Sequence, residues 1–246
     1  MKIKNVVILA AGRGKRFADA GFQTSKPLLE VSLKGRTQPV IAYNLSSLMD
    51  VGASVTVVGT PSVCRFLRTA GYEVEMVKVT VPRPSPVHSA LLSLGLLPPD
   101  EPVLFLDSDH VYNIPDFDYL LEDLDPMSSA GVIASRIGPN SAMCDVETDL
   151  DGRGFRLKEK VGVSPLVVTG GYYFRSAREF ESTAMNFITN QGLSKAGREK
   201  EVRMSDIVNS TQTYDRGFEI REIPPEAWIS VGTPDEFHSL TTKDQS

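Results

Sequence analysis

The chain has 246 residues, 41% of them apolar and 23% charged, which is the composition of a globular protein and suits one large α/β domain. A formal net charge of −5 disfavours the broad basic surface that nucleic-acid binding requires, so we expect no nucleic-acid partner. The apolar run near the start covers only residues 6–11, whereas a membrane span needs about 20, so the sequence predicts no membrane partner and a cytoplasmic protein.

The first predicted element is a strand at residues 6–11, whose apolar, β-branched run is typical of a strand buried on both faces. The loop after it combines two glycines with three cations: Gly12, Arg13, Gly14, Lys15 and Arg16. Glycines let backbone amides approach a ligand closely, and the cations favour an anion. The loop therefore predicts binding of a phosphate chain. Phe17 stands where a dinucleotide fingerprint needs a third glycine, and Arg16 where a Walker loop needs serine or threonine.

Helices and strands alternate in the next segment. The patterns predict helices at residues 39–51 and 61–70 and strands at 55–58 and 73–77, an alternation typical of a doubly wound α/β sheet. A proline-rich loop then leads into a predicted helix at residues 87–97, with His88 and Ser89 at its start. Either side chain can hydrogen-bond a base edge or a phosphate. Equally, Ser85 or Ser89 caps the helix and His88 is a surface group.

The predicted strand at residues 102–106 ends in two carboxylates, Asp107 and Asp109. Open α/β sheets bind ligands at the carboxyl ends of their strands, and carboxylate oxygens suit hard cations. The sequence therefore predicts a Mg²⁺ site here.

The second half contains predicted strands at residues 131–135, 165–174 and 218–223, a hairpin at 145–157 turning at Asp151-Gly152, and helices at 177–189 and from 204. The polar loop at 191–200 is a flap over the site or a solvated connection. We expect a single domain at residues 1–240 and a loose tail at 241–246.

Two separated motifs carry a family resemblance. Residues 9–16 read Leu-Ala-Ala-Gly-x-Gly-x-Arg, and Lys26-Pro27-Leu28 follows. This pair resembles the signature of sugar-phosphate nucleotidyltransferases of the GT-A-like fold, which implies a Rossmann-like, mostly parallel mixed sheet. Lys26, Arg16 and Asp109 are then the catalytic residues, with Asp109 the Mg²⁺ ligand. The resemblance assigns nucleotide binding to Leu9, Ala10, Ala11, Gly12, Arg13, Gly14, Lys15, His88, Ser89 and Asp107.

The resemblance continues toward the C-terminus, where a Glu-Lys element and a Thr-Gly-x-Tyr strand line the family's acceptor pocket. It implies acceptor-binding roles for Glu159, Lys160, Thr169, Gly170 and Asp206. Gly170 would admit the ligand close to the backbone. The segment at 227–237 resembles the family's Trp-x-Asp-x-Gly-Thr-Pro segment, but Ser230 stands where a second aspartate for Mg²⁺ is usual.

These observations favour an enzyme that transfers a nucleoside monophosphate from a nucleoside triphosphate to a phosphorylated small-molecule acceptor, with a sugar 1-phosphate as the default acceptor. The alternatives are a CTP-dependent cytidylyltransferase for a phospho-alcohol or phosphonate, a GT-A glycosyltransferase, and a non-catalytic nucleotide-binding domain, which would explain Ser230. A choline-type acceptor would need an aromatic and acidic cage, for which the candidates are Glu159, Tyr172, Tyr173 and Trp228.

Overall fold

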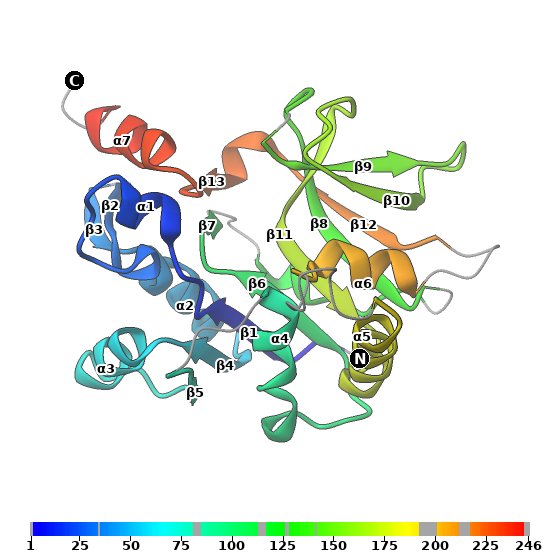
Figure 1. Ribbon diagram of the computed structural model, residues 1–246, viewed down its shortest axis with the longest axis horizontal. Helices are drawn as coiled ribbons and strands as arrows, with labels where there is room; N and C mark the ends of the chain where they lie inside the picture. Colours follow the sequence, from blue (N-terminus) through cyan, green and yellow to red (C-terminus); the bar gives the residue numbers. More distant parts are fainter. Residues whose placement is uncertain are drawn as a thin grey trace.

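A nine-stranded mixed sheet runs through the computed structural model, which describes residues 2–33, 35–80, 85–112, 117–125, 128–140, 142–191, 201–211 and 217–243 (Figure 1). Its strands are β1 (Asn5–Ala10), β4 (Ser54–Gly59), β5 (Glu75–Lys78), β6 (Val103–Asp107), β8 (Ala130–Arg136), β9 (Cys144–Thr148), β10 (Gly154–Glu159), β11 (Leu166–Phe174) and β12 (Glu219–Ile223). The order is β10-β9-β11-β6-β1-β4-β5, with β8 paired to both β11 and β12.

The strands β5-β4-β1-β6 form the parallel part of the sheet, with β1 in register with β4 and β6 at its centre. All six residues of β1 are buried, because a central parallel strand is covered on both faces. Parallel strands end at the same edge of a sheet, so the loop after β1 and the acidic end of β6 lie at one edge. The predicted phosphate loop and the predicted cation site are thereby brought together.

The other part of the sheet is mostly antiparallel and is organised by β11, which pairs with β6, β8 and β9. The pairing of β11 with β8 shifts register between Val168 and Gly171, which marks a β-bulge at Thr169 and Gly170. Bulges re-aim the chain beside functional sites. β9 and β10 form the predicted hairpin, and Gly152 turns it with a φ of 81°.

Helices cover both faces of the sheet, and alternate residues of β1 supply the two cores. Val6 and Ile8 face α2 (Val40–Asp50) and α3 (Pro61–Thr69). Val7 and Leu9 face the other core, which is covered by α4 (Pro86–Leu91), α5 (Ala177–Gln191) and α6 (Met204–Ser210). The prediction of a doubly wound, Rossmann-like α/β fold with a mixed sheet is confirmed.

Short elements complete the structure. Two small antiparallel sheets pair β2 (Glu30–Leu33) with β3 (Arg36–Pro39), and β7 (His110–Tyr112) with β13 (Trp228–Ser230). The remaining elements are α1 (Lys15–Asp19), α7 (Pro234–Lys243) and the 3-10 turns η1 (Lys26–Leu28), η2 (Leu94–Leu96), η3 (Phe117–Leu121) and η4 (Pro225–Ala227). None of the helices built by the described residues has the length and apolar character to cross a membrane.

Two boundaries differ from the sequence prediction. The helix expected at residues 87–97 ends at Leu91 and gives way to η2, because Gly95 and the prolines at 98 and 99 disfavour a continuing helix. α7 continues to Lys243, three residues into the segment expected to be a loose tail. Residues 81–84 of the proline-rich loop and 192–200 of the expected flap lie outside the described residues.

Candidate active site

The loop after β1 presents its cations to solvent. Gly14 caps α1 with a φ of 57°, a left-handed conformation that glycine adopts without steric cost. Arg13, Lys15 and Arg16 are exposed, and Arg16 lines a cavity of about 200 Å³ at this edge of the sheet. Phe17 is buried and packs edge-on against Phe22 and Phe237, so the loop is anchored to the C-terminal helix α7.

Lys26 lies opposite the acidic end of β6. Its ammonium Nζ donates to Asp109 Oδ2 at 2.7 Å and to the backbone oxygen of Gly232 at 3.2 Å. The Lys26 side chain is 17% exposed and the Asp109 side chain 30% exposed. Of the three predicted catalytic residues, Arg16 and Asp109 line the cavity, and Lys26 contacts Asp109 from beside it.

His110 is a site residue that the sequence analysis did not identify. Its Nδ1 lies 2.9 Å from Asp109 Oδ1, so the two oxygens of Asp109 face Lys26 and His110 respectively. The buried His110 ring packs against Trp228, with ring centroids 5.4 Å apart. On another side it meets the bulge of β11, where a Cβ on Gly170 would lie 2.6 Å from His110 Nδ1.

The absence of a side chain at Gly170 therefore leaves space for the His110 ring of the protein itself. With a φ of 85° it brings the backbone against His110 and against Asp107, whose Cβ would lie 3.1 Å from an added Cβ. The sequence analysis assigned this approach to the acceptor. Gly170 also lines the cavity, so the acceptor-binding role stays a prediction.

The electrostatics of this cluster are set by burial and mutual charge. Burial, and then the charge of Asp109, raise the pKa of Asp107 from its usual 3.8 to about 7. Burial alone would raise the pKa of Asp109, but the neighbouring His110 and Lys26 hold it well below its usual range. Burial opposes charge on His110, and the Asp109 carboxylate outweighs it and raises the His110 pKa. Asp109 is the firmly ionised member of the cluster.

The cluster fits a divalent cation of the hard type. Asp107, Asp109 and His110 each place one donor atom within 4.8 Å of the others. Mg²⁺ takes oxygen ligands and commonly uses one or two carboxylates completed by substrate phosphates and water, so the two aspartates suit it, whereas the His110 imidazole is better placed as a partner of Asp109. A cation here would also favour the ionised form of Asp107.

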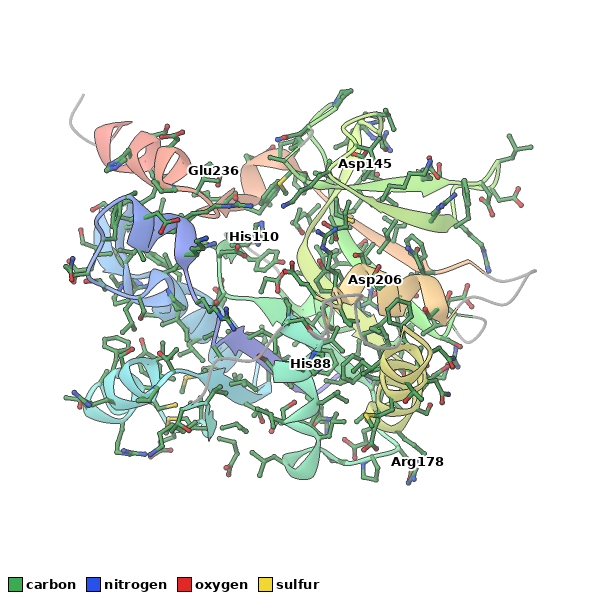
Figure 2. The ribbon with its side chains drawn as sticks, viewed as in Figure 1. His88, His110, Asp145, Arg178, Asp206 and Glu236 are labelled. Atoms are coloured by element: carbon green, nitrogen blue, oxygen red, sulfur yellow. The ribbon has the colours of Figure 1, made fainter. Side chains whose placement is uncertain are left out.

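The turn between β13 and α7 forms another wall of the cavity. Ser230 pairs with His110 across β13 and β7, and the backbone N–H of Val231 donates to the Asp109 carbonyl at 2.8 Å. Ser230 and Glu236 both line the cavity. Figure 2 shows Glu236 on α7 in the same region as His110, far from Arg178 on α5. Glu236 was not predicted as a site residue from the sequence.

The wall contributed by the second half of the chain combines one carboxylate with apolar groups. Glu159, at the end of β10, accepts a hydrogen bond from Ser205 Oγ at 2.6 Å and lies 3.7 Å from Arg203. Tyr172, Val168 and Met143 line the cavity beside it. Of the residues considered for a cage, Tyr173 is buried, donates to the Leu120 carbonyl and stacks under Arg221. It belongs to the core.

Three of the residues predicted to bind the acceptor do not line the cavity among the described residues. Lys160 is exposed, with a φ of 59°. The Thr169 hydroxyl is buried and donates to the Ile133 carbonyl at 3.2 Å. Asp206 caps α6 by accepting from the Arg203 backbone N–H at 2.9 Å. Among the described residues these three do not line the cavity, and their acceptor-binding roles stay predictions.

The nucleotide-binding predictions on β1 and α4 also remain untested. Leu9, Ala10 and Ala11 are buried at the end of β1, directly before the glycine loop. Ser85 caps α4 by accepting from the His88 backbone N–H at 3.4 Å, and its hydroxyl lies 2.7 Å from His88 Nδ1, while Ser89 is buried. The capping alternative thus has direct structural support.

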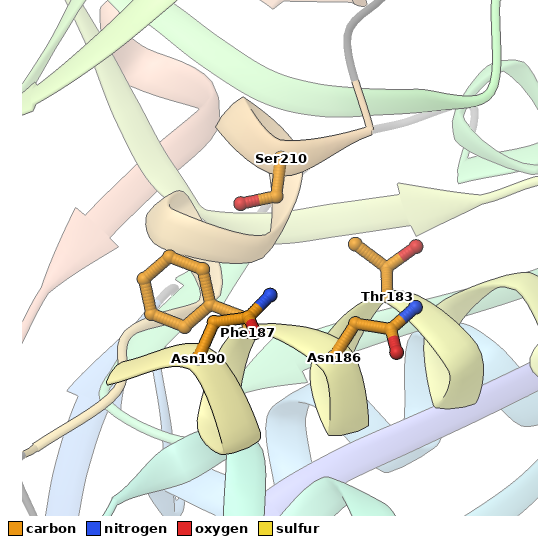
Figure 3. Close-up of a pocket in the computed structure, with 5 residues that line it drawn as sticks. All are labelled: Thr183, Asn186, Phe187, Asn190 and Ser210. Atoms are coloured by element: carbon orange, nitrogen blue, oxygen red, sulfur yellow. The ribbon is translucent and has the colours of Figure 1, made fainter. Parts of the chain in front are cut away.

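A second cavity of about 330 Å³ lies between α5 and α6, away from this cluster (Figure 3). Its lining residues are Thr183, Asn186, Phe187, Asn190 and Ser210. Among the described residues, the lining of this cavity carries no charged side chain.

The fold and the site define the class of protein: an α/β nucleotide-binding protein with a cationic glycine loop and two carboxylates at one cavity, and a lysine paired with one of those carboxylates. The sequence profile of the MobA-like NTP transferase domain matches residues 6–144, and the chain belongs to that family of nucleotidyltransferases. A comparison with curated protein sequences returned no match.

Two solved structures are similar over their full length. The nucleoside-diphosphate-sugar pyrophosphorylase from Vibrio cholerae RC9 has a TM-score of 0.75 and 16% identity, covering 96% of this chain and 99% of its own. The inositol-1-phosphate CTP transferase from T. maritima has a TM-score of 0.73 and 13% identity, covering 99% of this chain and 97% of its own. At these identities the likeness establishes the fold.

Proposed function

We propose that residues 1–240 form one nucleotidyltransferase domain that transfers a nucleoside monophosphate from a nucleoside triphosphate to a phosphorylated small molecule and releases pyrophosphate. A sugar 1-phosphate is the first choice of acceptor, and a cytoplasmic location follows from the supply of nucleoside triphosphates there. The observation that supports the proposal is that Arg16 and Asp109, predicted to act on the nucleotide, line the same cavity as Glu159 and Tyr172.

The reaction is a displacement at phosphorus. An oxygen of the acceptor phosphate forms a bond to the α-phosphorus, the bond from that phosphorus to the bridging oxygen breaks, and the electron pair leaves with pyrophosphate. The acceptor phosphate is already ionised at neutral pH, so no general base is needed. The protein contributes positioning and neutralisation of charge.

The roles of the residues follow from their places. Arg16 and the amides of the glycine loop would hold the β- and γ-phosphates. Lys26, whose Nζ is 2.7 Å from Asp109, would turn its ammonium to the α-phosphate and the acceptor. Asp109, with Asp107 beside it, would hold Mg²⁺, which supplies neutralisation of the triphosphate charge when bound. Glu159 would accept a hydrogen bond from the acceptor.

A second candidate is CTP-dependent transfer to a phospho-alcohol or phosphonate. Two observations favour it: the structural similarity to an inositol-1-phosphate CTP transferase, and the single carboxylate among apolar groups on the acceptor wall.

The test is pyrophosphate release with Mg²⁺, using CTP, UTP, GTP, ATP and dTTP in turn against sugar 1-phosphates, phospho-alcohols and phosphonates. We expect release that requires one triphosphate and one acceptor together, with the nucleotide-linked product identified by mass spectrometry. Binding of a triphosphate without release for any acceptor would contradict the proposal and favour a non-catalytic nucleotide-binding domain.

A further inference from the structure

At the junction of β13 and α7, the acidic side chain that faces the cavity is Glu236 of the helix, whereas the strand contributes the neutral Ser230. Ser230 ends β13 and pairs with His110, so it is the side chain that this strand contributes to the site. Its hydroxyl is neutral and a weak ligand for a hard cation. Glu236 lies in the first turn of α7 and lines the same cavity.

Hydrogen bonds hold the Glu236 carboxylate in place. Its Oε2 accepts from the Thr233 backbone N–H at 2.9 Å, and the Glu236 N–H donates to Thr233 Oγ1 at 3.2 Å, which together form a capping box. Oε2 also accepts from Ser230 Oγ at 3.1 Å, a contact that capping does not require. Oε1 has no hydrogen-bond partner within the part of the chain that the structure describes.

Gly232 leaves Glu236 and Asp109 facing one space. A Cβ added to Gly232 would lie 3.2 Å from Glu236 Oε2, 3.3 Å from Ser230 Oγ and 3.8 Å from Asp109 Oδ2. The three oxygens thus surround the position where another residue would place its side chain. Because glycine has no side chain, this position beside the two carboxylates stays open, and Lys26 Nζ lies 2.7 Å from the same Asp109 oxygen.

We propose that Glu236 supplies the acidic charge that an aspartate at position 230 would bring, acting toward the divalent cation across Gly232 beside Asp109 and in addition to Asp107. The inference rests on the proposed function. An aspartate at 230 would put two carboxylates where Ser230 and Glu236 now share a hydrogen bond, and like charges at that separation repel. Ser230 and Glu236 are therefore a matched pair, in which the serine donates and the glutamate keeps the charge.

Glu236 is a positioning residue in this scheme. The close group of donor atoms consists of Asp107, Asp109 and His110, and Glu236 lies outside it. Its charge strengthens the negative potential that draws and holds the cation. Acids in such outer positions commonly change metal affinity by about 10–100-fold when they are removed.

The experiment measures Mn²⁺ binding by electron paramagnetic resonance of free Mn²⁺, without nucleotide or turnover. Glu236→Gln removes the charge but preserves the capping box, because glutamine serves equally at that helix position. We expect its Mn²⁺ affinity to fall about tenfold. Ser230→Asp added to Glu236→Gln should restore the affinity. Asp235→Asn, an exposed neighbour on the same helical turn, is the matched control and should bind as the wild type does.

A stability cycle gives a second readout. Ser230→Asp alone should lower Tm in metal-free buffer, because it places a carboxylate against Glu236. In the Glu236→Gln background the same substitution should cost much less, and the difference between the two drops measures the coupling.

Unchanged Mn²⁺ affinity in Glu236→Gln, an equal loss in Asp235→Asn, or no saturable Mn²⁺ binding by the wild type would each overturn the inference. The proposed function is tested by a separate measurement, pyrophosphate release by the wild type. If the wild type releases pyrophosphate and Glu236→Gln binds Mn²⁺ normally, only the role of Glu236 fails. If no substrate pair gives release, the proposed function fails whatever the Mn²⁺ titration shows.

Discussion

Lys26 is one of the two cationic partners, with His110, that hold Asp109 in its ionised form. Its ammonium offers three donors, and two of them go to Asp109 and the Gly232 carbonyl. These partners lie in the turn between β6 and β7 and in the turn before α7, so one side chain joins two segments of the site. The same donors suit the oxygens of a phosphate, which would compete with Asp109 for the ammonium.

We expect Lys26→Ala to lower kcat by about 10²–10³-fold, the cost of removing one well-placed donor from a charged transition state. The fold should survive, because Asp109 keeps its ion pair with His110. Steady-state pyrophosphate release and the far-UV circular dichroism spectrum measure the two effects. Lys4→Ala, at an exposed position beside β1, is the control. Near-normal turnover in Lys26→Ala would contradict its assignment.

Asp107 makes a different prediction, which concerns stability. Its folded-state pKa of about 7 lies above the ordinary value of 3.8, so folding takes up a proton between about pH 4 and pH 7. A raised carboxyl pKa means that stability falls as pH rises through this window. Asp107→Asn removes the free-energy cost of ionising this buried carboxyl. The Tm of the variant should therefore exceed that of the wild type by several degrees at pH 8 and by less at pH 5.

The measurement for Asp107→Asn is differential scanning calorimetry at both pH values. Asp50→Asn, at the exposed end of α2, serves as the control and should change Tm equally at both. A Tm difference that does not depend on pH would show that Asp107 is not held at a raised pKa in the folded protein.

At the scale of elements, the bulge in β11 decides the geometry of the cluster. It turns the Gly170 backbone against His110 and Asp107, at a φ that side chains rarely adopt. The β7–β13 pairing supports the other side of His110 through Trp228. The site therefore depends on strands that are far apart in the sequence.

Gly170→Ala should destabilise the protein and disrupt the cluster. The added Cβ would lie 2.6 Å from His110 Nδ1, and a non-glycine residue at this φ carries a cost of about 1–3 kcal/mol. We expect a lower Tm and a changed fluorescence of Trp228, the only tryptophan, which packs on His110. Gly95→Ala is the matched control, because nothing lies within 4 Å of its added Cβ. Equal Tm values for the two variants would refute this reading of the bulge.

The elements that the sequence predicts well are those whose signal is local. The glycine loop follows β1, and Asp107 and Asp109 stand at and just after the end of β6; both strands are recognisable from a few residues, and their parallel order brings these groups to one edge of the sheet. His110 was missed because its role depends on Gly170 and Trp228, which only the tertiary fold brings to it. Glu236 was missed because Thr-x-x-Glu is an ordinary helix start, and only Ser230 reveals its second contact.

For the whole molecule, the two halves of the chain divide the cavity. The NTP transferase profile covers residues 6–144, which include the glycine loop, Lys26 and Asp109. Glu159 and Tyr172, which line the same cavity, lie beyond that match, in the part of the sheet organised by β11. We infer that residues 6–144, together with Gly232 and Glu236 of the turn before α7, handle the triphosphate and its cation, and that Glu159 and Tyr172 act in the choice of acceptor.

This division predicts that Glu159→Gln and Arg16→Ala affect different ligands. Glu159→Gln keeps the size of the side chain, so the loss of charge should raise KM for the acceptor about 10-fold or more, because hydrogen bonds to charged groups contribute about 1.5–3 kcal/mol. Its dissociation constant for the triphosphate should stay unchanged. Arg16→Ala should weaken triphosphate binding and leave KM for the acceptor nearly as it was.

Asp151→Asn, exposed at the tip of the β9–β10 hairpin, controls for charge loss in the second half. Isothermal titration with the triphosphate and initial rates at varied acceptor concentration separate the two effects. If Glu159→Gln weakened triphosphate binding as much as Arg16→Ala does, the two walls would act on one ligand, and the division between the halves would be wrong.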